Sequence, residues 1–313
     1  MTLPGDLPSA GRAQLTPSAP DGFVAVCAQI APRLGDVSAN LETHLGILED
    51  ASRGGAHLVV FPEMSLCGYF LRDLVPDVAV VLDGPELATL AAACTEVDAV
   101  VGCVLETGDA RFLNAAVHLS RGRVAALHAK VFLPTYGLFD EQRYLAAGER
   151  LRTLELTPPA AGLARPWQAG MLICEDIWHL GAIALLARQG MEVLIVPSAS
   201  PGRGVRDGAG LGTARSYDAM TRTYAQLTTA YVVYCNRVGF EDGVGFWGGS
   251  RVLGPDGETL HEPAGSDEAL VWNRLERGAV RRARLATPLL RDARPDLLDR
   301  ETARLRHGER HRH

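Results

Sequence analysis

Three residues whose side chains can do nucleophilic chemistry stand at the ends of apolar stretches. Glu63 ends "VVFPE", Lys130 ends "VAALHAK" and Cys174 ends "GMLIC". A residue at the end of a strand is held by its sheet, yet it faces the rim where loops form clefts. Taken singly, each has an ordinary explanation: a solvated glutamate, a lysine that extends to the surface, and a packed thiol. The three residue types together indicate a catalytic site.

These side chains have complementary roles in the attack of a thiol on an acyl carbon. A free thiol has a pKa of about 8.5, so little thiolate exists at neutral pH and the cysteine needs a base. Glu63 in an apolar pocket would have a raised pKa and could take the proton. The attack moves negative charge onto the carbonyl oxygen, where one preorganised donor lowers the barrier by ~3 kcal/mol. Lys130 is the candidate for that donor.

Lys130 is the only lysine in the chain, since the other 30 of the 31 Lys and Arg residues are arginine. A planar guanidinium needs more room and two acceptors side by side, whereas an ammonium is a compact point charge. We infer that this position requires a small cation between a carboxylate and an oxyanion.

Composition indicates an ordinary globular protein. The chain has 313 residues, of which 47% are hydrophobic and 22% charged, and its net charge is −6. The charges are interspersed, which argues against nucleic acid or an anionic membrane as the main partner. We find no apolar run near the ~20 residues of a membrane span and no secretory signal. The six cysteines are scattered, as in a reduced cytoplasmic protein.

Periodicity predicts an alternation of strands and helices within one domain. Strands are predicted at 23–30, 57–63, 99–106, 112–119, 124–130, 167–174, 193–200, 231–238 and 246–253. Helices are predicted at 36–54, with Asp36 as N-cap, and at 85–97, 176–189 and 207–230. The pattern implies an α/β fold with a mixed sheet covered by helices on one face. We expect a disordered leader (1–21), a catalytic domain (22–280), and a C-terminal extension with a polar, Arg-rich tail (281–313).

Five motifs carry a family resemblance. They are "FPEMSLCGY" (61–69), "KVFLPTYGLFDEQRYL" (130–145), "ICEDIW" (173–178), "SASP" (198–201), and "NRVG" with "GFWGGSRVLGPDG" (236–257). With them the sequence is identified as a member of the nitrilase superfamily of carbon-nitrogen hydrolases, and it most resembles the glutaminase domain of glutamine-dependent NAD synthetases. The resemblance implies a four-layer α-β-β-α sandwich that pairs with a second copy, so a homodimer or higher homo-oligomer is expected.

The resemblance also implies roles for individual residues. Cys174 would be the nucleophile, Glu63 the general base and then the acid, and Lys130 the oxyanion donor together with the backbone N–H of Glu175. Glu141 matches the family's second glutamate, which helps to position the substrate and the lysine. The implied reaction is hydrolysis of an amide to acid and ammonia through a cysteine thioester.

Four further positions match residues that contact substrate in the glutaminase domains. Tyr136, Glu175 and Trp178 fall where those domains contact glutamine, and Ser200 lies in the corresponding serine-containing loop. The expected partner is therefore a small linear carboxamide, with glutamine as one candidate. The chemistry implies no metal and no organic cofactor.

The sequence departs from the synthetases in three places. Nothing resembles their Ser-Gly-Gly-x-Asp-Ser loop, so we expect that the chain is not itself an NAD synthetase, and a separate ammonia-accepting synthetase is a possible partner. "FLRDL" (70–74) replaces the usual Pro-Pro-Glu-Asp-Leu, and "GRG" (202–204) follows "SP" where an aromatic and a basic residue are common. Arg203 or Arg206 could still meet a substrate carboxylate.

Alternative readings remain open at this stage. A nitrilase or a carbamoyl amidase would use the same nucleophile, and a non-catalytic subunit of a separate synthetase could keep the fold. A Gly-x-Ser-x-Gly elbow is absent and the cysteines are not clustered, which disfavours serine hydrolase and zinc chemistry. The histidines His44, His57, His118 and His128 are predicted to be polar edges of core elements.

Overall fold

The strand β2 (Gly22–Gln29) is buried along its whole length because it is covered on both faces. Its odd-numbered residues contact one hydrophobic core: Phe23, Ala25 and Cys27. Its even-numbered residues contact another: Val24, Val26 and Ala28. Successive side chains of a strand point to opposite faces, so a continuous apolar run is typical of a strand between two layers. The computed structural model describes residues 7–12, 21–206 and 210–306.

Within these residues the first sheet has eight strands, and β2 lies inside it. The order is β1 (Ser9–Ala10), β17 (Ala269–Glu276), β2, β3 (Leu58–Val60), β5 (Asp98–Glu106), β6 (Phe112–Ser120) and β7 (Arg123–Ala129), with β4 (Val80–Val81) beside β5. β2, β3 and β5 run parallel, whereas β6 and β7 follow as antiparallel hairpins. This is the mixture of parallel and antiparallel strands that the sequence predicted.

The second sheet has five strands in the same described part of the chain. Their order is β16 (Arg251–Leu253), β13 (Tyr231–Asn236), β10 (Val193–Ser198), β9 (Trp167–Met171) and β8 (Thr153–Leu156). β9, β10 and β13 are parallel, so their carboxyl ends meet at one edge. Two short ribbons complete the strands: β11 (Val205–Arg206) with β12 (Gly210–Leu211), and β14 (Val238–Glu241) with β15 (Val244–Trp247).

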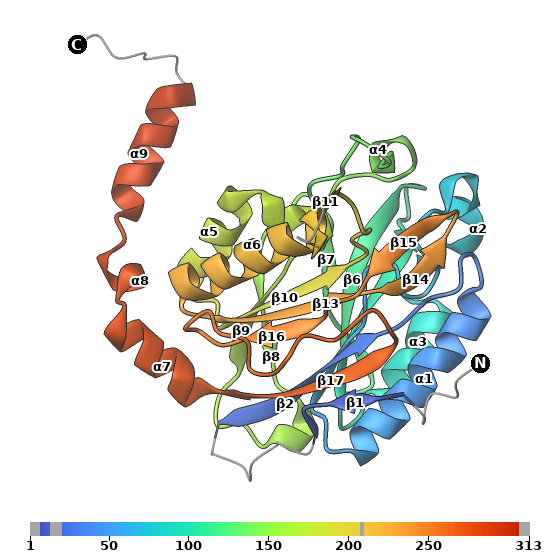
Figure 1. Cartoon of the computed structure of the whole chain (residues 1–313), viewed down its shortest axis with the longest axis horizontal. Coiled ribbons are helices and arrows are strands. Elements are labelled where there is room, and N and C mark those ends of the chain that lie inside the picture. The colour runs from blue at the N-terminus through green and yellow to red at the C-terminus, as the bar shows by residue number, and fades with distance from the viewer. Residues whose placement is uncertain (1–6, 13–20, 207–209, 307–313) are drawn as a thin grey trace.

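Helices cover the outer face of each sheet. α1 (Val37–Arg53) and α3 (Pro85–Ala93) pack on the first sheet, and α5 (Leu180–Arg188) and α6 (Gly212–Thr228) pack on the second (Figure 1). The layers therefore run α-β-β-α, which confirms the predicted sandwich. The predicted N-cap is also confirmed, since the carboxylate of Asp36 accepts a hydrogen bond from the N–H of Ala39.

The remaining helical elements are short or lie toward the C-terminus. They are η3 (Arg72–Leu74), α2 (Val75–Val78), α4 (Glu141–Tyr144), η4 (Pro159–Ala161), η5 (Cys174–Trp178), α7 (Arg277–Ala286), α8 (Leu289–Asp292) and α9 (Pro295–Arg306). No helix in the described residues is both long enough and apolar enough to cross a membrane.

The leader differs from the expected disorder where it is described. Ser9–Ala10 forms β1, which pairs in parallel with β17, and the carbonyl of Pro8 accepts a hydrogen bond from the N–H of Leu270 at 2.8 Å. The guanidinium of Arg12 lies 4.9 Å from the ring centre of Trp272. An edge strand offers unpaired backbone groups, and this segment uses them. The rest of the predicted leader, 1–6 and 13–20, lies outside the described residues.

Several predicted boundaries also differ. The strand predicted at 246–253 is divided between β15 and β16 because Gly248 and Gly249 have φ of +68° and +70°. The helix predicted at 176–189 is two elements, η5 and α5, that meet at His179. The predicted domain boundary at 280 falls inside α7, and the polar extension contains α8 and α9, which lead away from the body (Figure 1).

Candidate active site

Lys130 brings two carboxylates together in the interior of the molecule. Its Nζ donates to Oε1 of Glu63 at 2.7 Å and to Oε1 of Glu141 at 2.5 Å. All three side chains are buried, and Lys130 lines the same pocket as Cys174. Glu63, Lys130 and Cys174 come shortly after β3, β7 and β9, and these strands belong to two different sheets. The sandwich therefore brings together residues that are far apart in the sequence.

The carboxylate of Glu63 is held in place by neighbours on both of its oxygens. Asn114 Nδ2 donates to Oε1 at 2.7 Å, beside the lysine, and the backbone N–H of Ala199 donates to Oε2 at 2.8 Å. The turn around Glu63 lies against Gly102, where a Cβ atom would approach the carbonyl oxygen of Pro62 to 2.3 Å. A glycine is therefore required at 102, because any side chain would displace the base.

Burial and charge set the protonation of the lysine and its second carboxylate. Burial disfavours the ammonium, but Glu141 and Glu63 outweigh it and raise the pKa of Lys130 well above its ordinary value. Burial raises the pKa of Glu141, while Lys130 opposes that shift. Tyr69 also donates to Oε1 of Glu141, at 2.5 Å. The lysine is therefore a fixed cation between two carboxylates, whereas the shape argument expected one carboxylate and the substrate oxyanion.

Cys174 opens the short helix η5 in an unusual backbone conformation. Its φ is +46°, in the left-handed region that costs a non-glycine residue of order 1–3 kcal/mol. The side chain is buried, and its Sγ lies 3.1 Å from the hydroxyl of Tyr217. Burial and the charge of Glu63 raise the pKa of Cys174 well above that of an ordinary thiol, against the opposing effects of Lys130 and Tyr217. The resting group is a thiol, which needs a base.

Transfer of the thiol proton to Glu63 would leave the total charge of the buried cluster unchanged. Before the transfer the charges are those of two carboxylates and the ammonium of Lys130, and afterwards the thiolate of Cys174 replaces one carboxylate. Isolated charges are costly to bury, whereas moving a proton between neighbours creates no additional net charge. The arrangement favours base-assisted attack over a permanently ionised thiolate.

Asp176 ties the segment of the lysine to that of the cysteine. Its Oδ1 accepts from the N–H groups of Val131 at 3.0 Å and Phe132 at 2.9 Å. Its Oδ2 accepts from the N–H of Ile173 at 3.0 Å and lies 2.8 Å from Nε2 of His128. Our sequence analysis did not single out Asp176, although it is a fully buried acid inside the quoted motif "ICEDIW".

The four predicted substrate contacts line one pocket of about 400 Å³ together with Lys130 and Cys174: Tyr136, Glu175, Trp178 and Ser200. The hydroxyl of Tyr136 donates to Oε2 of Glu175 at 2.8 Å. Burial raises the pKa of Glu175, while Tyr136 and Lys130 oppose that shift. The pocket therefore holds a carboxylate close to the cysteine.

Arg203 also lines this pocket. Its guanidinium lies 5.8 Å from the ring centre of Phe139 and packs against Gly137, so these two residues hold it in place. Ser200 is buried, and its Oγ accepts from the indole N–H of Trp247 at 3.2 Å. The second candidate arginine, Arg206, belongs to β11, and its side chain lies outside the described part of the structure.

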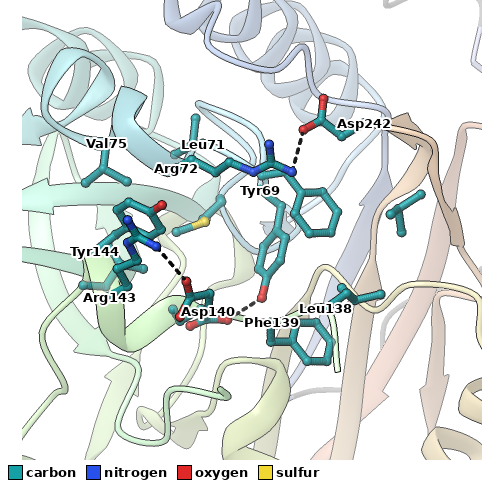
Figure 2. A pocket seen from close by; sticks show the side chains of 15 residues that line it. Tyr69, Leu71, Arg72, Val75, Leu138, Phe139, Asp140, Arg143, Tyr144 and Asp242 are labelled. Atoms are coloured by element: carbon teal, nitrogen blue, oxygen red, sulfur yellow. Dashed lines mark hydrogen bonds and ion pairs between the residues drawn. The ribbon is translucent and has the colours of Figure 1, made fainter. Parts of the chain in front are cut away.

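Glu141 lines a second pocket of about 370 Å³ (Figure 2). Tyr69 and Phe139 line both pockets and so separate them. Two ion pairs lie along the second pocket, Arg72 with Asp242 at 3.2 Å and Arg143 with Asp140 at 3.9 Å. The expected contact between Glu141 and the lysine is present, but Glu141 does not line the pocket that contains the cysteine.

Sequence reasoning missed four residues of the site: Tyr69, Asn114, Asp176 and Tyr217. Tyr69 stands in the quoted motif "FPEMSLCGY", and Asn114 is a polar interruption of an apolar strand, so both left a local signal. Tyr217 left none, because its relation to the cysteine depends on how α6 packs over the second sheet.

The histidines occupy polar positions within or beside the core, as predicted. His44 lies 2.9 Å from Ser65 Oγ, and His118 lies 3.0 Å from Asp98. Nδ1 of His57 accepts from the backbone N–H of Val24 at 2.9 Å. Within the described ranges no three His, Cys, Asp or Glu side chains are grouped so that they could hold a metal ion.

Comparisons with known proteins identify relatives of this chain. The family model described as Carbon-nitrogen hydrolase matches residues 23–285. The glutamine-dependent NAD(+) synthetase of Rhodobacter capsulatus is 36% identical over 264 residues, which cover 83% of this chain and 45% of the relative. The chain thus spans less than half the length of that relative.

Two solved structures share the fold, one over about half of its own length and the other over nearly all of it. The glutamine-dependent NAD+ synthetase of Acinetobacter baumannii superposes with a TM-score of 0.71 and 26% identity, over 83% of this chain and 46% of that one. An amidase from Nesterenkonia sp. AN1 superposes with a TM-score of 0.71 and 23% identity, over 89% of this chain and 99% of that one.

Proposed function

Since this chain belongs to the carbon-nitrogen hydrolase family and is an enzyme that acts on carbon–nitrogen bonds, we propose that it hydrolyses a small linear carboxamide to an acid and ammonia. The observation that carries the proposal is the contact of Lys130 Nζ with Glu63 at 2.7 Å, beside the pocket that contains Cys174. An acid, a fixed cation and a thiol are the groups that amide cleavage through a thioester needs.

The first half of the reaction makes the thioester. The sulfur of Cys174 forms a bond to the amide carbon while its proton passes to Glu63. The ammonium of Lys130 stabilises the negative charge on the carbonyl oxygen, and the backbone N–H of Glu175 is the proposed second donor. The tetrahedral intermediate collapses as Glu63 returns the proton to the leaving nitrogen, and ammonia departs.

The second half releases the acid. A water molecule gives a proton to Glu63 and attacks the thioester carbon, and the carbon–sulfur bond breaks as the electron pair returns to Cys174. Protonation of the sulfur by Glu63 restores the resting cluster. The sum is amide plus water to acid plus ammonia.

The pocket supports an amide that also carries an α-amino acid group, with glutamine as the leading candidate. Glu175 offers a carboxylate that could receive an ammonium, and Arg203 offers a guanidinium that could receive a carboxylate. Both side chains line the pocket that contains Cys174, so a substrate of a few carbons could reach them with its amide at the sulfur.

An ammonia-release screen tests this function. The substrates are glutamine, asparagine, other ω-amides, carbamoyl amino acids and simple nitriles, with Cys174→Ala as the inactive control. We expect release from an ω-amide in the wild type and none in the variant at an unchanged melting temperature. Full activity in Cys174→Ala would refute the mechanism, and release from nitriles alone would favour a nitrilase.

Matched substrates test the two charged contacts separately. Glutamine is compared with an analogue that lacks the α-amino group and with one that lacks the α-carboxylate. Glu175→Gln should reduce the preference for the amino group, and Arg203→Gln the preference for the carboxylate. Arg72→Gln, in the neighbouring pocket, is the control. Equal use of all three amides by the wild type would rule out amino acid recognition.

A further inference from the structure

We propose that Tyr217 is a catalytic residue of this site, whose hydroxyl donates a hydrogen bond to the sulfur of Cys174 whenever that sulfur is negatively charged. The oxygen lies 3.1 Å from Sγ. The assignment rests on the proposed function, because it adds a group to the same reaction. No motif of the sequence pointed to Tyr217.

The direction of the hydrogen bond follows from a second contact. The indole Nε1 of Trp178 lies 3.4 Å from the Tyr217 oxygen, and an indole N–H can only donate. That donation occupies an acceptor position of the hydroxyl and leaves its own proton for the sulfur. Trp178, predicted as a substrate contact, thereby also orients Tyr217.

Packing holds the Tyr217 ring in this position. It meets Trp178 edge to face at 5.9 Å between ring centres, and Tyr234 lies 5.2 Å away on another side. The ring is 3% exposed, so little water competes for the hydroxyl. A hydrogen bond to a charged group is stronger when water is excluded.

The electrostatic surroundings show why such a donor is needed. The titratable side chains around the sulfur come from several elements: Glu63, Tyr69, Lys130, Tyr136, Tyr217 and Tyr234. Burial and Glu63 disfavour the thiolate, whereas Lys130, the hydroxyl of Tyr217 and the backbone N–H of Ala199 favour it. However, the lysine ammonium already donates to two carboxylates and must also reach the substrate oxygen. Among the side chains that the structure describes, that of Tyr217 is the one that lies within hydrogen-bond distance of the sulfur.

The sulfur carries charge twice in the cycle. It does so when its proton moves to Glu63 before attack, and again when the carbon–sulfur bond of the thioester breaks and the electron pair returns to it. Tyr217 keeps its own proton in both steps. Its loss should therefore make the thiol harder to ionise and the thioester slower to hydrolyse.

Alkylation of Cys174 by iodoacetamide as a function of pH tests this directly, because it requires no substrate. The modified peptide is quantified by mass spectrometry, with Cys174→Ala to verify the site. In Tyr217→Phe the apparent pKa of alkylation should rise by about one unit, and the rate at neutral pH should fall about tenfold. Tyr234→Phe removes a hydroxyl from the same cluster and should leave the profile unchanged.

The outcomes separate the proposal from the function on which it rests. A wild-type alkylation profile in folded Tyr217→Phe overturns the role of Tyr217, whatever the enzyme hydrolyses. A shifted profile with no hydrolysis of any amide by the wild type refutes the proposed function but supports the hydrogen bond. If the variant shows the shifted alkylation profile and the wild type hydrolyses an amide, Tyr217→Phe should accumulate thioester in a rapid-quench experiment.

A second variant decides the question if Tyr217→Phe does not fold. Trp178→Phe keeps an aromatic ring but removes the N–H that orients the tyrosine hydroxyl. Its alkylation profile should shift in the same direction by a smaller amount. An unchanged alkylation profile in this variant would contradict the proposal that Trp178 orients the hydroxyl of Tyr217.

Discussion

At the scale of single residues, the site is a balance of buried charges. Lys130 is 1% exposed and contacts two carboxylates, and Cys174 is held beside them as a neutral thiol. Breaking a buried ion pair by removing one partner leaves an uncompensated charge and costs ~3–5 kcal/mol. Substitutions at this cluster therefore have to preserve charge if their effect on catalysis is to be separated from their effect on folding.

Lys130→Arg is the substitution that preserves charge but changes shape. The guanidinium is larger and planar, so we expect it to displace Glu141 or Glu63 and to miss the substrate oxygen. Loss of one oxyanion donor lowers kcat about 100-fold or more. The measurement is kcat/KM on the best amide of the screen, with the melting temperature as the control for folding. Wild-type kcat/KM in Lys130→Arg would contradict the argument from shape.

At the scale of elements, Asp176 joins the loop after β7 to the helix η5. It receives three backbone N–H groups, so the two segments share one anchor. Asp176→Asn replaces one accepting oxygen with an amide group that can only donate, and at least one buried N–H loses its partner.

We expect Asp176→Asn to lower the free energy of unfolding by ~2–3 kcal/mol and to reduce kcat at temperatures where it remains folded. Urea unfolding and steady-state kinetics measure the two effects. Asp140→Asn, an exposed change in the same loop region, is the control and should alter neither quantity. Unchanged kcat in folded Asp176→Asn would show that the anchor does not position the site.

His44 connects α1 to the turn that follows Glu63. Its ring contacts the carbonyl of Asn40 at 2.7 Å and Ser65 Oγ at 2.9 Å, and burial lowers the pKa of His44 from 6.5 to about 4. Below pH 6.5 His44 becomes protonated in the unfolded chain, whereas in the folded chain it stays neutral until the pH approaches 4. Stability is therefore retained above the unfolded pKa and is lost as the pH falls from 6.5 toward 4, by up to about 3 kcal/mol.

The variant His44→Gln isolates the contribution of His44 to the pH dependence of stability. Glutamine can hydrogen-bond but does not titrate, so the variant should be less stable at neutral pH and yet lose less stability between pH 6.5 and 4.5. Chemical unfolding of both proteins across that range gives the difference in slope. Identical slopes would exclude His44 as a source of the acid sensitivity.

At the scale of the whole molecule, one outer groove is lined mostly by apolar side chains. A groove of about 920 Å³ runs between the α5–α6 layer and the segment α8–α9, and exposed leucines line it: Leu180, Leu227, Leu289 and Leu298. Single exposed leucines are common, but contiguous apolar surface is typical of an interface. The sequence resemblance predicts a second copy, and we propose that it binds here.

The oligomeric state checks this prediction. Light scattering after size-exclusion chromatography at micromolar concentration should give the mass of a dimer or larger assembly. Leu227→Asp should reduce that mass, whereas Leu74→Asp, an exposed leucine of η3 outside the groove, should not. A wild-type monomer at these concentrations would refute the expected self-association.

The sequence alone predicted the candidate reacting groups and most of the elements. Glu63, Lys130 and Cys174 could be recognised because each ends an apolar stretch, and a strand end is a local feature of the chain. The helix after Asp36 was predictable for the same reason, since its cap and its period lie within a few residues. Within the apolar β2, the sequence did not reveal which residues face which core.

Only the tertiary structure decided the partners of those residues. Asn114 meets Glu63 across 51 positions and Tyr217 meets Cys174 across 43, and no periodicity relates them. Their contacts arise from how two sheets stack and from where α6 crosses the second one, which is set by side-chain packing across the layers. The same holds for β1, which is ordered because β17 leaves an edge open to it. Residue type and local pattern identify the reacting groups, but the neighbours that tune them are chosen by packing over long sequence separations.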